Sequence, residues 1–313
     1  MGGGKRGPPG GGITALGSSA SLLVLGSAFL FQVPQQPAAL ESQGLRVMVL
    51  ERDDQDAAAW RAIRNLGANV VATLRPPSDQ TDEIARGAGL TYLAFLTTDD
   101  IQTLARDPFR IAEAMAERGL AGFYYWDANV LEGFTTPETQ QKAYSTLKGL
   151  FPEKLVLYPT RLDPIVWSPD FLDGYFRPEY TDLVTPYFYP VGTTTLGPAQ
   201  EGDAWPVTLG GLLSELAPRL PPGKGLLPVL QGFEQTGYPV GSGFLAEQLA
   251  VYRRSWPTLS NVAIFSWKIA EGETAPLVEL ADLPTLQRGV CTFFASLSPG
   301  PARCRWSNVI PFR

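Results

Sequence analysis

The sequence predicts an α/β fold, a (β/α)8 barrel that follows an N-terminal signal or membrane-anchor segment. Short apolar runs alternate with helical patterns, and eight such strand-helix units fit within about 260 residues, a size typical of these barrels. The 313-residue chain is 44% hydrophobic and 18% charged. It therefore has enough apolar side chains to fold around a substantial core.

Eight apolar runs are the predicted strands. Each is almost continuously apolar, as expected for parallel strands that are covered on both faces. In chain order they comprise residues 46–50, 69–74, 91–96, 122–126, 154–158, 182–188, 226–230 and 261–266.

Helical patterns separate these runs. Residues 54–65 and 244–256 place apolar side chains on one stripe, and residues 99–118 do so with a break at Asp107-Pro108. Thr136-Pro137-Glu138 predicts a helix start, with an N-cap, a proline in the first turn and an acid near the positive end.

Two other features concern the connections. Asp99 and Asp100 begin the pattern at 99–118, and we expect one of them to be its N-cap. The connections after the fifth and sixth strands are long and rich in Pro, Tyr and Trp. This composition predicts short helices or loops in both places.

An open, doubly wound sheet is the alternative to a barrel. Such a sheet usually carries a glycine-rich phosphate-binding turn after its first strand. Here the turn is Glu51-Arg52-Asp53-Asp54, which is acidic where a phosphate needs backbone amides and positive charge. The barrel is therefore favoured.

The beginning of the chain predicts export or membrane attachment. Lys5 and Arg6 precede 34 residues without a charge, and residues 13–33 among them are apolar. The pattern is typical of a signal peptide, with Gly26-Ser27-Ala28 as a cleavage site, or of an uncleaved membrane anchor. A disordered Gly/Pro leader is a further alternative.

We therefore divide the chain into two parts. Residues 1–40 are the signal or anchor with a Pro/Gln spacer, and residues 41–313 are the barrel domain. Basic residues before the apolar stretch predict that the barrel lies outside the cytoplasm, secreted, periplasmic or held at the cell surface.

The two cysteines, Cys291 and Cys304, are too few for a Cys-only metal site. Oxidising compartments outside the cytoplasm allow disulfides to persist, and the turn Ser298-Pro299-Gly300-Pro301 lies between the two. We expect a disulfide that closes the C-terminal tail. The alternative is that Cys291 packs as a small buried residue.

Composition excludes several classes of function. The chain has no histidine, which rules out Ser-His-Asp and Cys-His nucleophile systems and His-ligated metal sites. A net charge of −6 and a pI near 4.9 argue against a nucleic-acid partner. We expect no cofactor, no metal, and membrane contact only through an uncleaved N-terminal segment.

Polar and aromatic side chains gather where the predicted strands end. In a (β/α)8 barrel, the carboxyl ends of the strands and the loops after them form the active site. The chain places there Glu51, Asp53, Asp54, Arg75, Thr97, Asp99, Asp100, Trp126, Asp127, Asn129, Tyr158, Arg161, Asp163, Tyr187, Tyr189, Gln231, Glu234, Trp267 and Lys268.

This combination suits a carbohydrate site. Aromatic faces stack on sugar rings, while two carboxyl groups supply the acid and the nucleophile or base of glycosidic cleavage. Asp127 and Glu234 are the candidate catalytic residues; Asp127 follows four consecutive aromatics, whose desolvation favours the raised pKa of a general acid. A loop-capping Asp127 and a solvated Glu234 are the alternatives. The predicted substrate-binding residues are Glu51, Trp126, Tyr158, Arg161, Tyr187, Tyr189, Gln231, Trp267 and Lys268.

The layout resembles that of the TIM-barrel glycoside hydrolases. In their largest clan the acid/base follows strand four and the nucleophile follows strand seven, and Asp127 and Glu234 lie near those two places. Phe265-Ser266-Trp267 is also similar to that clan, in which an aromatic residue after strand eight often floors the sugar subsite. The resemblance covers about residues 45–284 and implies hydrolysis of a poly- or oligosaccharide.

One motif departs from that clan. The clan commonly carries Asn-Glu-Pro at strand four, whereas this chain has Asp127-Ala128-Asn129. Either Asp127 acts one residue earlier, or Glu132 serves instead, or the barrel has lost the reaction and is a non-catalytic glycan-binding protein of the cell surface. Whether configuration is retained or inverted depends on the spatial separation of the carboxylates, which spacing in sequence does not fix.

Overall fold

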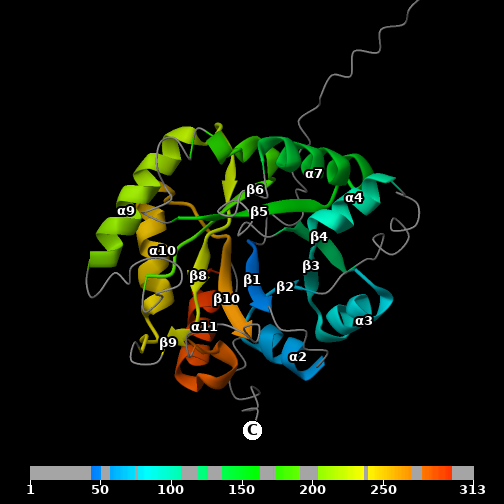
Figure 1. Cartoon of the computed structure of the whole chain (residues 1–313). Coiled ribbons are helices and arrows are strands. Elements are labelled where there is room, and N and C mark those ends of the chain that lie inside the picture. Colours follow the sequence, from blue (N-terminus) through cyan, green and yellow to red (C-terminus); the bar gives the residue numbers. More distant parts are fainter. Residues whose placement is uncertain are drawn as a thin grey trace, which may run out of the picture. The chain divides into compact units, whose positions relative to one another are not determined.

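The computed structural model describes residues 44–50, 57–74, 77–106, 119–125, 136–162, 172, 174–190, 204–235, 239–268 and 277–297. Its main sheet is a closed parallel barrel of eight strands with helices between them (Figure 1). The predicted (β/α)8 fold is confirmed.

The barrel strands match the eight predicted runs closely. They are β1 (Arg46–Leu50), β2 (Val70–Thr73), β3 (Thr91–Phe95), β4 (Leu120–Tyr124), β5 (Leu155–Arg161), β6 (Leu183–Tyr187), a seventh strand made of β7 (Gly225–Leu226) and β8 (Val229–Gln231), and β10 (Val262–Lys268). The seventh strand is interrupted at Pro228, which has no N–H to donate. Their spatial order is β5-β4-β3-β2-β1-β10-β8-β6, and the pairing of β5 with β6 closes the barrel.

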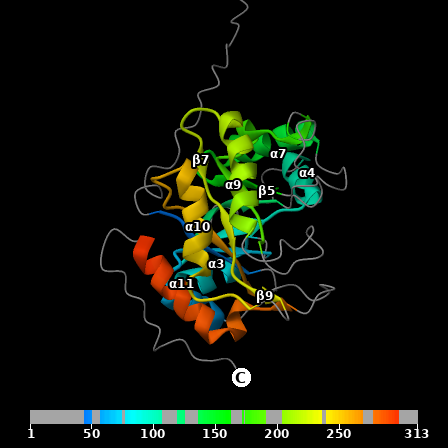
Figure 2. The same cartoon turned by 90° about the vertical axis from the view of Figure 1, so that its left-hand side faces the viewer.

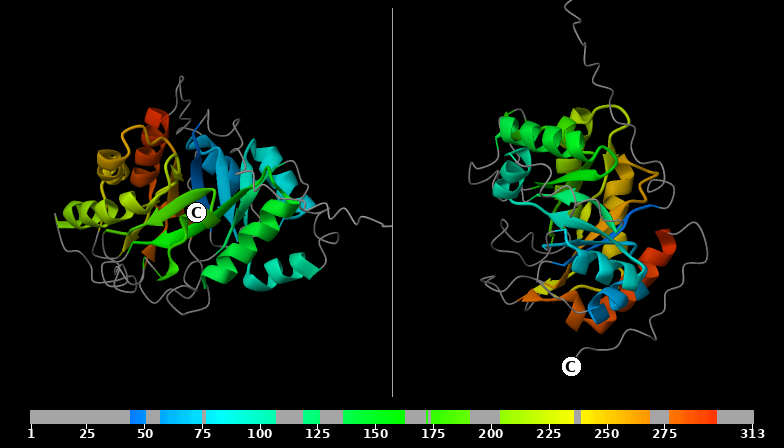
Figure 3. Two further views of the ribbon diagram at one scale, coloured as in Figure 1. Left: turned by 90° about the horizontal axis from the view of Figure 1, so that it is seen from above. Right: turned by 90° about the vertical axis from the view of Figure 1, so that its right-hand side faces the viewer.

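Seven α-helices of the described residues follow the strands and lie outside the sheet (Figures 1 and 3). They are α2 (Ala57–Asn65), α3 (Asp79–Ala88), α4 (Thr98–Arg106), α7 (Pro137–Leu150), α9 (Trp205–Leu216), α10 (Phe244–Ser255) and α11 (Pro284–Leu297). The helix α10 packs between α9 and α11 (Figure 2).

Successive side chains along each strand point alternately into the barrel and outward to the helices, so the protein has two apolar cores. One core fills the barrel and includes Val47, Val49, Val70, Ala72, Leu93, Leu155, Leu157, Leu183, Val229 and Ala263. The other lies between the strands and the helices and includes Met48, Leu50, Val71, Tyr92, Phe123, Val156, Val184, Leu230 and Ile264. Both faces of each strand are thus apolar, which explains the unbroken runs in the sequence.

The fourth strand begins earlier than predicted. It spans Leu120–Tyr124 and not residues 122–126, because its pairing with β3 already begins at Leu120 opposite Tyr92. Within it, Gly122 lies against Leu155 of β5 so closely that a Cβ would clash with the Leu155 backbone. The strand therefore ends three positions before Asp127.

The prediction of a short helix or loop after the sixth strand is wrong. The helix α9 has 12 residues and buries Trp205, Leu209, Leu212, Leu213 and Leu216. Its Pro206 lies in the first turn, where a missing N–H costs no helical hydrogen bond. After the fifth strand, the described residues contain a 3-10 turn at Pro178–Tyr180.

The two predicted helix starts have different outcomes. Thr136 caps α7 as predicted, with its Oγ1 accepting from Thr139 N–H at 3.3 Å. For α4, however, Thr97 takes the capping role expected of Asp99 or Asp100. Asp100 N–H donates to Thr97 Oγ1 at 3.1 Å, and Asp100 Oδ2 accepts from Thr97 N–H at 2.8 Å, so the two residues form a capping box.

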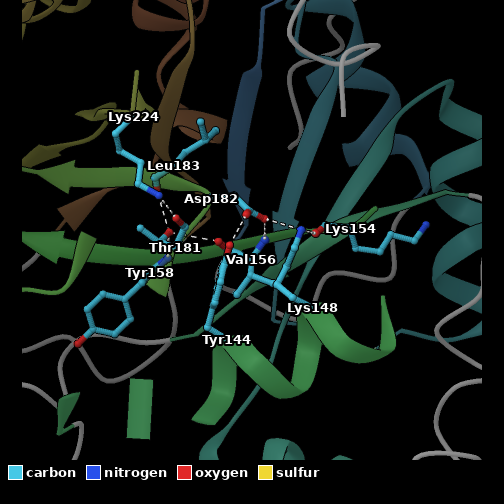
Figure 4. Close-up of polar contacts among 9 residues, drawn as sticks. All are labelled: Tyr144, Lys148, Lys154, Val156, Tyr158, Thr181, Asp182, Leu183 and Lys224. Atoms are coloured by element: carbon cyan, nitrogen blue, oxygen red, sulfur yellow. Dashed lines mark hydrogen bonds and ion pairs between the residues drawn. The ribbon is translucent and has the colours of Figure 1, made fainter. Parts of the chain in front are cut away.

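The amino-terminal end of the barrel carries a buried polar cluster (Figure 4). Asp182, which precedes β6, forms an ion pair with Lys148 of α7 at 3.1 Å, with both side chains less than a tenth exposed. Its two oxygens also accept from Tyr144 Oη at 2.9 Å and from Val156 N–H at 2.8 Å. Lys224, before β7, donates to the carbonyl of Thr181. This cluster ties α7 to the first residues of three neighbouring strands.

The predictions for the chain termini lie outside the described residues. These include the signal or anchor at 1–40 and Cys304, whereas Cys291 is buried in α11. Among the described helices, none is long and apolar enough to cross a membrane. The export segment and the disulfide stay predictions.

Candidate active site

Six aromatic side chains surround the carboxyl-terminal end of the barrel, which we call the mouth. These mouth aromatics are Phe95, Tyr124, Tyr187, Tyr189, Phe233 and Phe265. They come from the ends of β3, β4 and β6, from β10, and from the residues after β6 and β8. An aromatic layer therefore covers the barrel core at this end.

The mouth aromatics form two groups. Tyr189 is central to the larger one: its ring stacks on Phe265 at 5.1 Å and 24° and contacts Phe233 edge-on at 5.3 Å. Tyr187 lies 5.3 Å from Tyr189 on the other side. Phe95 and Tyr124 form a separate pair at 5.4 Å. Four of the six residues, all but Tyr124 and Phe233, are only partly buried.

Arg161 lies between these two groups in the order of the strands. It is the last residue of β5, it faces Tyr187 across the β5–β6 pairing, and it is half-buried. The next residue, Leu162, donates its N–H to Tyr187 O at 2.8 Å and so extends the pairing. The structure thus places Arg161 and Tyr187 together at the mouth, as the sequence predicted.

Glu234 lies just beyond the mouth aromatic Phe233. It belongs to β9 (Glu234–Gln235), which pairs antiparallel with β11 (Leu277–Val278) and so joins the segment after strand seven to the segment after strand eight. Its Oε1 accepts from Val240 N–H at 3.1 Å, and the side chain is partly exposed. One carboxylate oxygen is therefore fixed by the backbone of a neighbouring loop.

Three other predicted binding residues are buried. Tyr158 packs in the core outside the barrel, with its ring 4.9 Å from Tyr125, and Trp267 is fully buried in the same core. Gln231 is also fully buried, and its Nε2 donates to Phe233 O at 3.2 Å. Among the aromatics of strand eight, Phe265 and not Trp267 lies in the mouth.

Five candidate catalytic or binding residues named in the sequence analysis fall wholly or partly outside the part of the chain that the structure describes. Glu51, Trp126, Asp127 and the alternative acid Glu132 lie outside the described residues, as does the side chain of Lys268. The roles predicted for them stay predictions. Among the described residues, no group of three or more acidic or cysteine side chains is suited to hold a metal ion.

Tyr125, the last described residue before Trp126 and Asp127, is buried. Burial, together with the nearby Tyr144, raises the pKa of its phenol. Tyr144 likewise has a raised pKa, because of burial first and then of its bond to Asp182. Both phenols therefore stay neutral at ordinary pH.

Phe95, Tyr124, Phe233 and Phe265 were missed as mouth residues by sequence reasoning. For strands three, four and eight, that reasoning began with Thr97, Trp126 and Trp267, whereas Phe95, Tyr124 and Phe265 lie two positions earlier, within the strands. A step of two residues back from Thr97 and from Trp126 would have identified Phe95 and Tyr124.

No family model matches this sequence, and no curated protein matches it. Solved structures do match it. A GH2 β-galacturonidase from Eisenbergiella tayi is 13% identical, with a TM-score of 0.53 over 81% of this chain and 51% of its own. A β-D-glucuronidase from Dictyoglomus thermophilum is 13% identical, with a TM-score of 0.52 over 86% of this chain and 51% of its own. A β-galactosidase from the psychrophilic Marinomonas ef1 is 7% identical, with a TM-score of 0.52 over 81% and 59%.

These similarities concern the fold. The chain has the (β/α)8 barrel fold that the TIM-barrel glycoside hydrolases share, and the resemblance predicted from the sequence is confirmed at that level. The chain spans about half the length of the first two solved structures.

Proposed function

We propose that this protein is a glycoside hydrolase that acts outside the cytoplasm and cleaves a poly- or oligosaccharide at the barrel mouth. The observation that carries the proposal is the layer of mouth aromatics, of which Tyr187, Tyr189 and Phe265 keep partly exposed rings beside the half-buried Arg161. Sugar rings offer apolar faces to such rings and hydroxyl groups to a guanidinium.

Glu234 and Asp127 are the proposed working carboxylates. Glu234 lies next to the mouth, and the Val240 N–H holds one of its oxygens, which leaves the other to face a substrate. Asp127 is proposed as the general acid, because it follows the end of β4 by three positions and succeeds the buried Tyr125. Glu51, Trp126 and Lys268 complete the proposed site, and the buried Gln231 supports it through its bond to Phe233 O.

Hydrolysis of this kind involves no cofactor. The acid protonates the glycosidic oxygen, and the second carboxylate either attacks the anomeric carbon or activates a water. A separation near 5 Å between the two carboxyl groups would give retention, and about 6.5–9.5 Å would give inversion.

Release of reducing ends tests this proposal. The full chain is incubated with a panel of plant, fungal and bacterial polysaccharides, and the products are separated by mass. The proposal expects at least one substrate to be cleaved. Retention of a polysaccharide on the protein without cleavage would instead make it a glycan-binding barrel, and neither binding nor cleavage would remove carbohydrate from the account.

Export is a separate part of the proposal. The mass of the protein recovered from outside the cytoplasm should fit either cleavage after Ala28 or the intact N-terminus. Thiol titration of the unreduced protein should find neither Cys291 nor Cys304 free. Recovery of the chain only inside the cytoplasm, with both thiols free, would contradict this part alone.

A further inference from the structure

The pairing between β6 and the seventh strand ends early on the mouth side. These strands share the register pair Tyr187 and Val229, whereas β10 follows β8 as far as Phe265 opposite Gln231. If β6 and β8 continued to pair for two more residues, Tyr189 would lie opposite Gln231. However, Tyr189 lies beyond the end of β6, and its ring stacks in the mouth.

Gln231 therefore needs another partner for its backbone. On the β10 side, the Gly232 N–H donates to Phe265 O. Backbone groups of successive residues in a strand point to opposite sides, so the N–H and C=O of Gln231 face away from β10, where the described part of β6 has ended. A buried peptide group without a partner destabilises the folded state.

The side chain of Gln248 takes the place of the missing strand. Gln231 N–H donates to Gln248 Oε1 at 2.9 Å, and Gln248 Nε2 donates to Gln231 O at 3.2 Å. Gln248 comes from α10 and is only 1% exposed. Its carboxamide offers one acceptor and one donor on the same plane, which is what the edge of a strand offers.

These bonds continue into the mouth. The Gln231 side chain donates to Phe233 O, Phe233 contacts the ring of Tyr189, and Glu234 is the next residue. We propose that Gln248 is a positioning residue, whose carboxamide fixes the backbone where strand seven leaves the barrel and thereby places Phe233 and Glu234. Its effect on sugar cleavage rests on the proposed function, whereas its effect on the backbone does not.

A second buried glutamine provides a matched control. Gln287 of α11 is 4% exposed, and its Nε2 donates to Leu280 O at 2.9 Å and to Ala281 O at 2.8 Å. It thus also bonds main-chain carbonyls, but in a segment that carries none of the mouth aromatics. Gln→Met at either position removes the carboxamide and keeps an unbranched side chain.

Hydrogen exchange of the full chain tests the positioning role. In Gln248→Met, the amides of residues 229–235 should exchange about tenfold faster than in the wild type, while those of 46–50 in β1 stay unchanged. Gln287→Met should leave residues 229–233 protected; Glu234 and Gln235 are left out of this comparison because they pair with β11, which directly precedes the segment that Gln287 bonds. The proposal is wrong if Gln248→Met leaves exchange at 229–233 at the wild-type rate, or if Gln287→Met accelerates it equally.

A second variant covers the case that Gln248→Met does not fold. In Gln248→Glu, a protonated carboxyl can both accept and donate, whereas an ionised one can only accept. After correction for intrinsic exchange rates, residues 229–235 should be protected near about pH 5 and exposed near about pH 8, with no such change in the wild type. Equal protection at both pH values would overturn the proposal.

Kinetics separate this inference from the proposed function. On any cleaved saccharide, Gln248→Met should lower kcat by about tenfold or more with KM nearly unchanged, because a carboxylate displaced by a fraction of an ångström loses alignment. Equal losses in Gln287→Met would overturn the positioning role. If the wild type cleaves no saccharide while exchange at 229–235 responds as expected, the proposed function fails and the backbone role of Gln248 stands.

Discussion

The two ends of the barrel use polar groups in opposite ways. At the amino-terminal end, Asp182 and Lys148 are buried together, and the carboxylate is bonded by Tyr144 and by the backbone of Val156 (Figure 4). At the mouth, Arg161 and Glu234 are partly exposed. Arg161 lies opposite Tyr187, and Glu234 follows Phe233. The charges of Asp182 and Lys148 at the amino-terminal end are buried and paired, whereas Arg161 and Glu234 at the mouth stay partly exposed.

This difference separates stability from function along the barrel axis. Bonds at the strand starts join Asp182 to Val156 of β5 and Lys224 to the carbonyl of Thr181, so they hold β5, β6 and strand seven together where these strands begin. In barrels of this fold, the residues of the mouth loops can change without disturbing the amino-terminal end, and active sites are found at the mouth. Substitutions at the two ends should therefore affect different properties.

The largest expected effect is at the amino-terminal end. Asp182→Ala leaves Lys148 buried without its counter-charge and removes the acceptor of Val156 N–H. The free energy of unfolding in urea should fall by about 3–5 kcal/mol. The double variant Asp182→Leu/Lys148→Met should lose less than the single one, since no charge stays buried alone. A single variant as stable as the wild type would contradict the structural role of this cluster.

A mouth substitution should show the reverse pattern. Tyr189→Ala removes the ring that stacks on Phe265 and should weaken binding of a recognised saccharide by about tenfold. Calorimetric titration measures this loss. Tyr175→Ala, which removes a ring that is 41% exposed, is the control and should bind normally. Equal binding by Tyr189→Ala and the wild type would remove the mouth aromatics from the proposed site.

The capping box of α4 predicts a smaller effect. Thr97→Ala removes the hydroxyl that accepts from Asp100 N–H, at a cost of about 1 kcal/mol in unfolding free energy. Thr97→Ser keeps the hydroxyl and should be close to the wild type. If alanine and serine were equally stable at this position, the cap would contribute nothing.

The smallest effect concerns pH at the start of α7. Hydrogen bonds from its own backbone N–H and then from the Thr136 hydroxyl lower the pKa of Glu138. Because the folded pKa is lowered, this contribution to stability is complete above the ordinary glutamate pKa and is lost as the pH falls through the lowered one. NMR titration of the Glu138 carboxyl should show a higher pKa in Thr136→Ala than in the wild type or Thr136→Ser. No difference between them would contradict the assigned cause.

Some of this structure could be predicted from the sequence because burial leaves a direct pattern. Strands covered on both faces read as unbroken apolar runs, and the Thr136 cap follows from residue type and spacing alone. The helix α9 was missed because Pro206 suggests a loop, although a proline in the first turn is compatible with a helix.

The candidate site was less predictable for two reasons. Phe265 and Trp267 are two residues apart and would share a face in a regular strand, but the pairing of β10 with β1 shifts register between Ile264 and Lys268, so Phe265 faces the barrel interior while Trp267 packs in the outer core. Such an irregularity has no pattern in the sequence. The role of Gln248 depends on where β6 stops pairing, and a carboxamide that bonds a distant backbone has no sequence pattern.

Hydrolysis by variants of the two ends of the barrel most directly tests the claim that catalysis depends on Asp127 and Glu234 and stability on the amino-terminal cluster. Reducing ends released by the full chain are compared for the wild type, Asp127→Asn, Glu234→Gln and Asp182→Leu/Lys148→Met, each at a temperature where it is folded. The account predicts that Asp127→Asn and Glu234→Gln lose about 10²- to 10⁴-fold in turnover with melting temperatures nearly unchanged, while the amino-terminal variant keeps its turnover and melts lower. Full turnover in Asp127→Asn and Glu234→Gln, or loss of turnover in the folded amino-terminal variant, would contradict it.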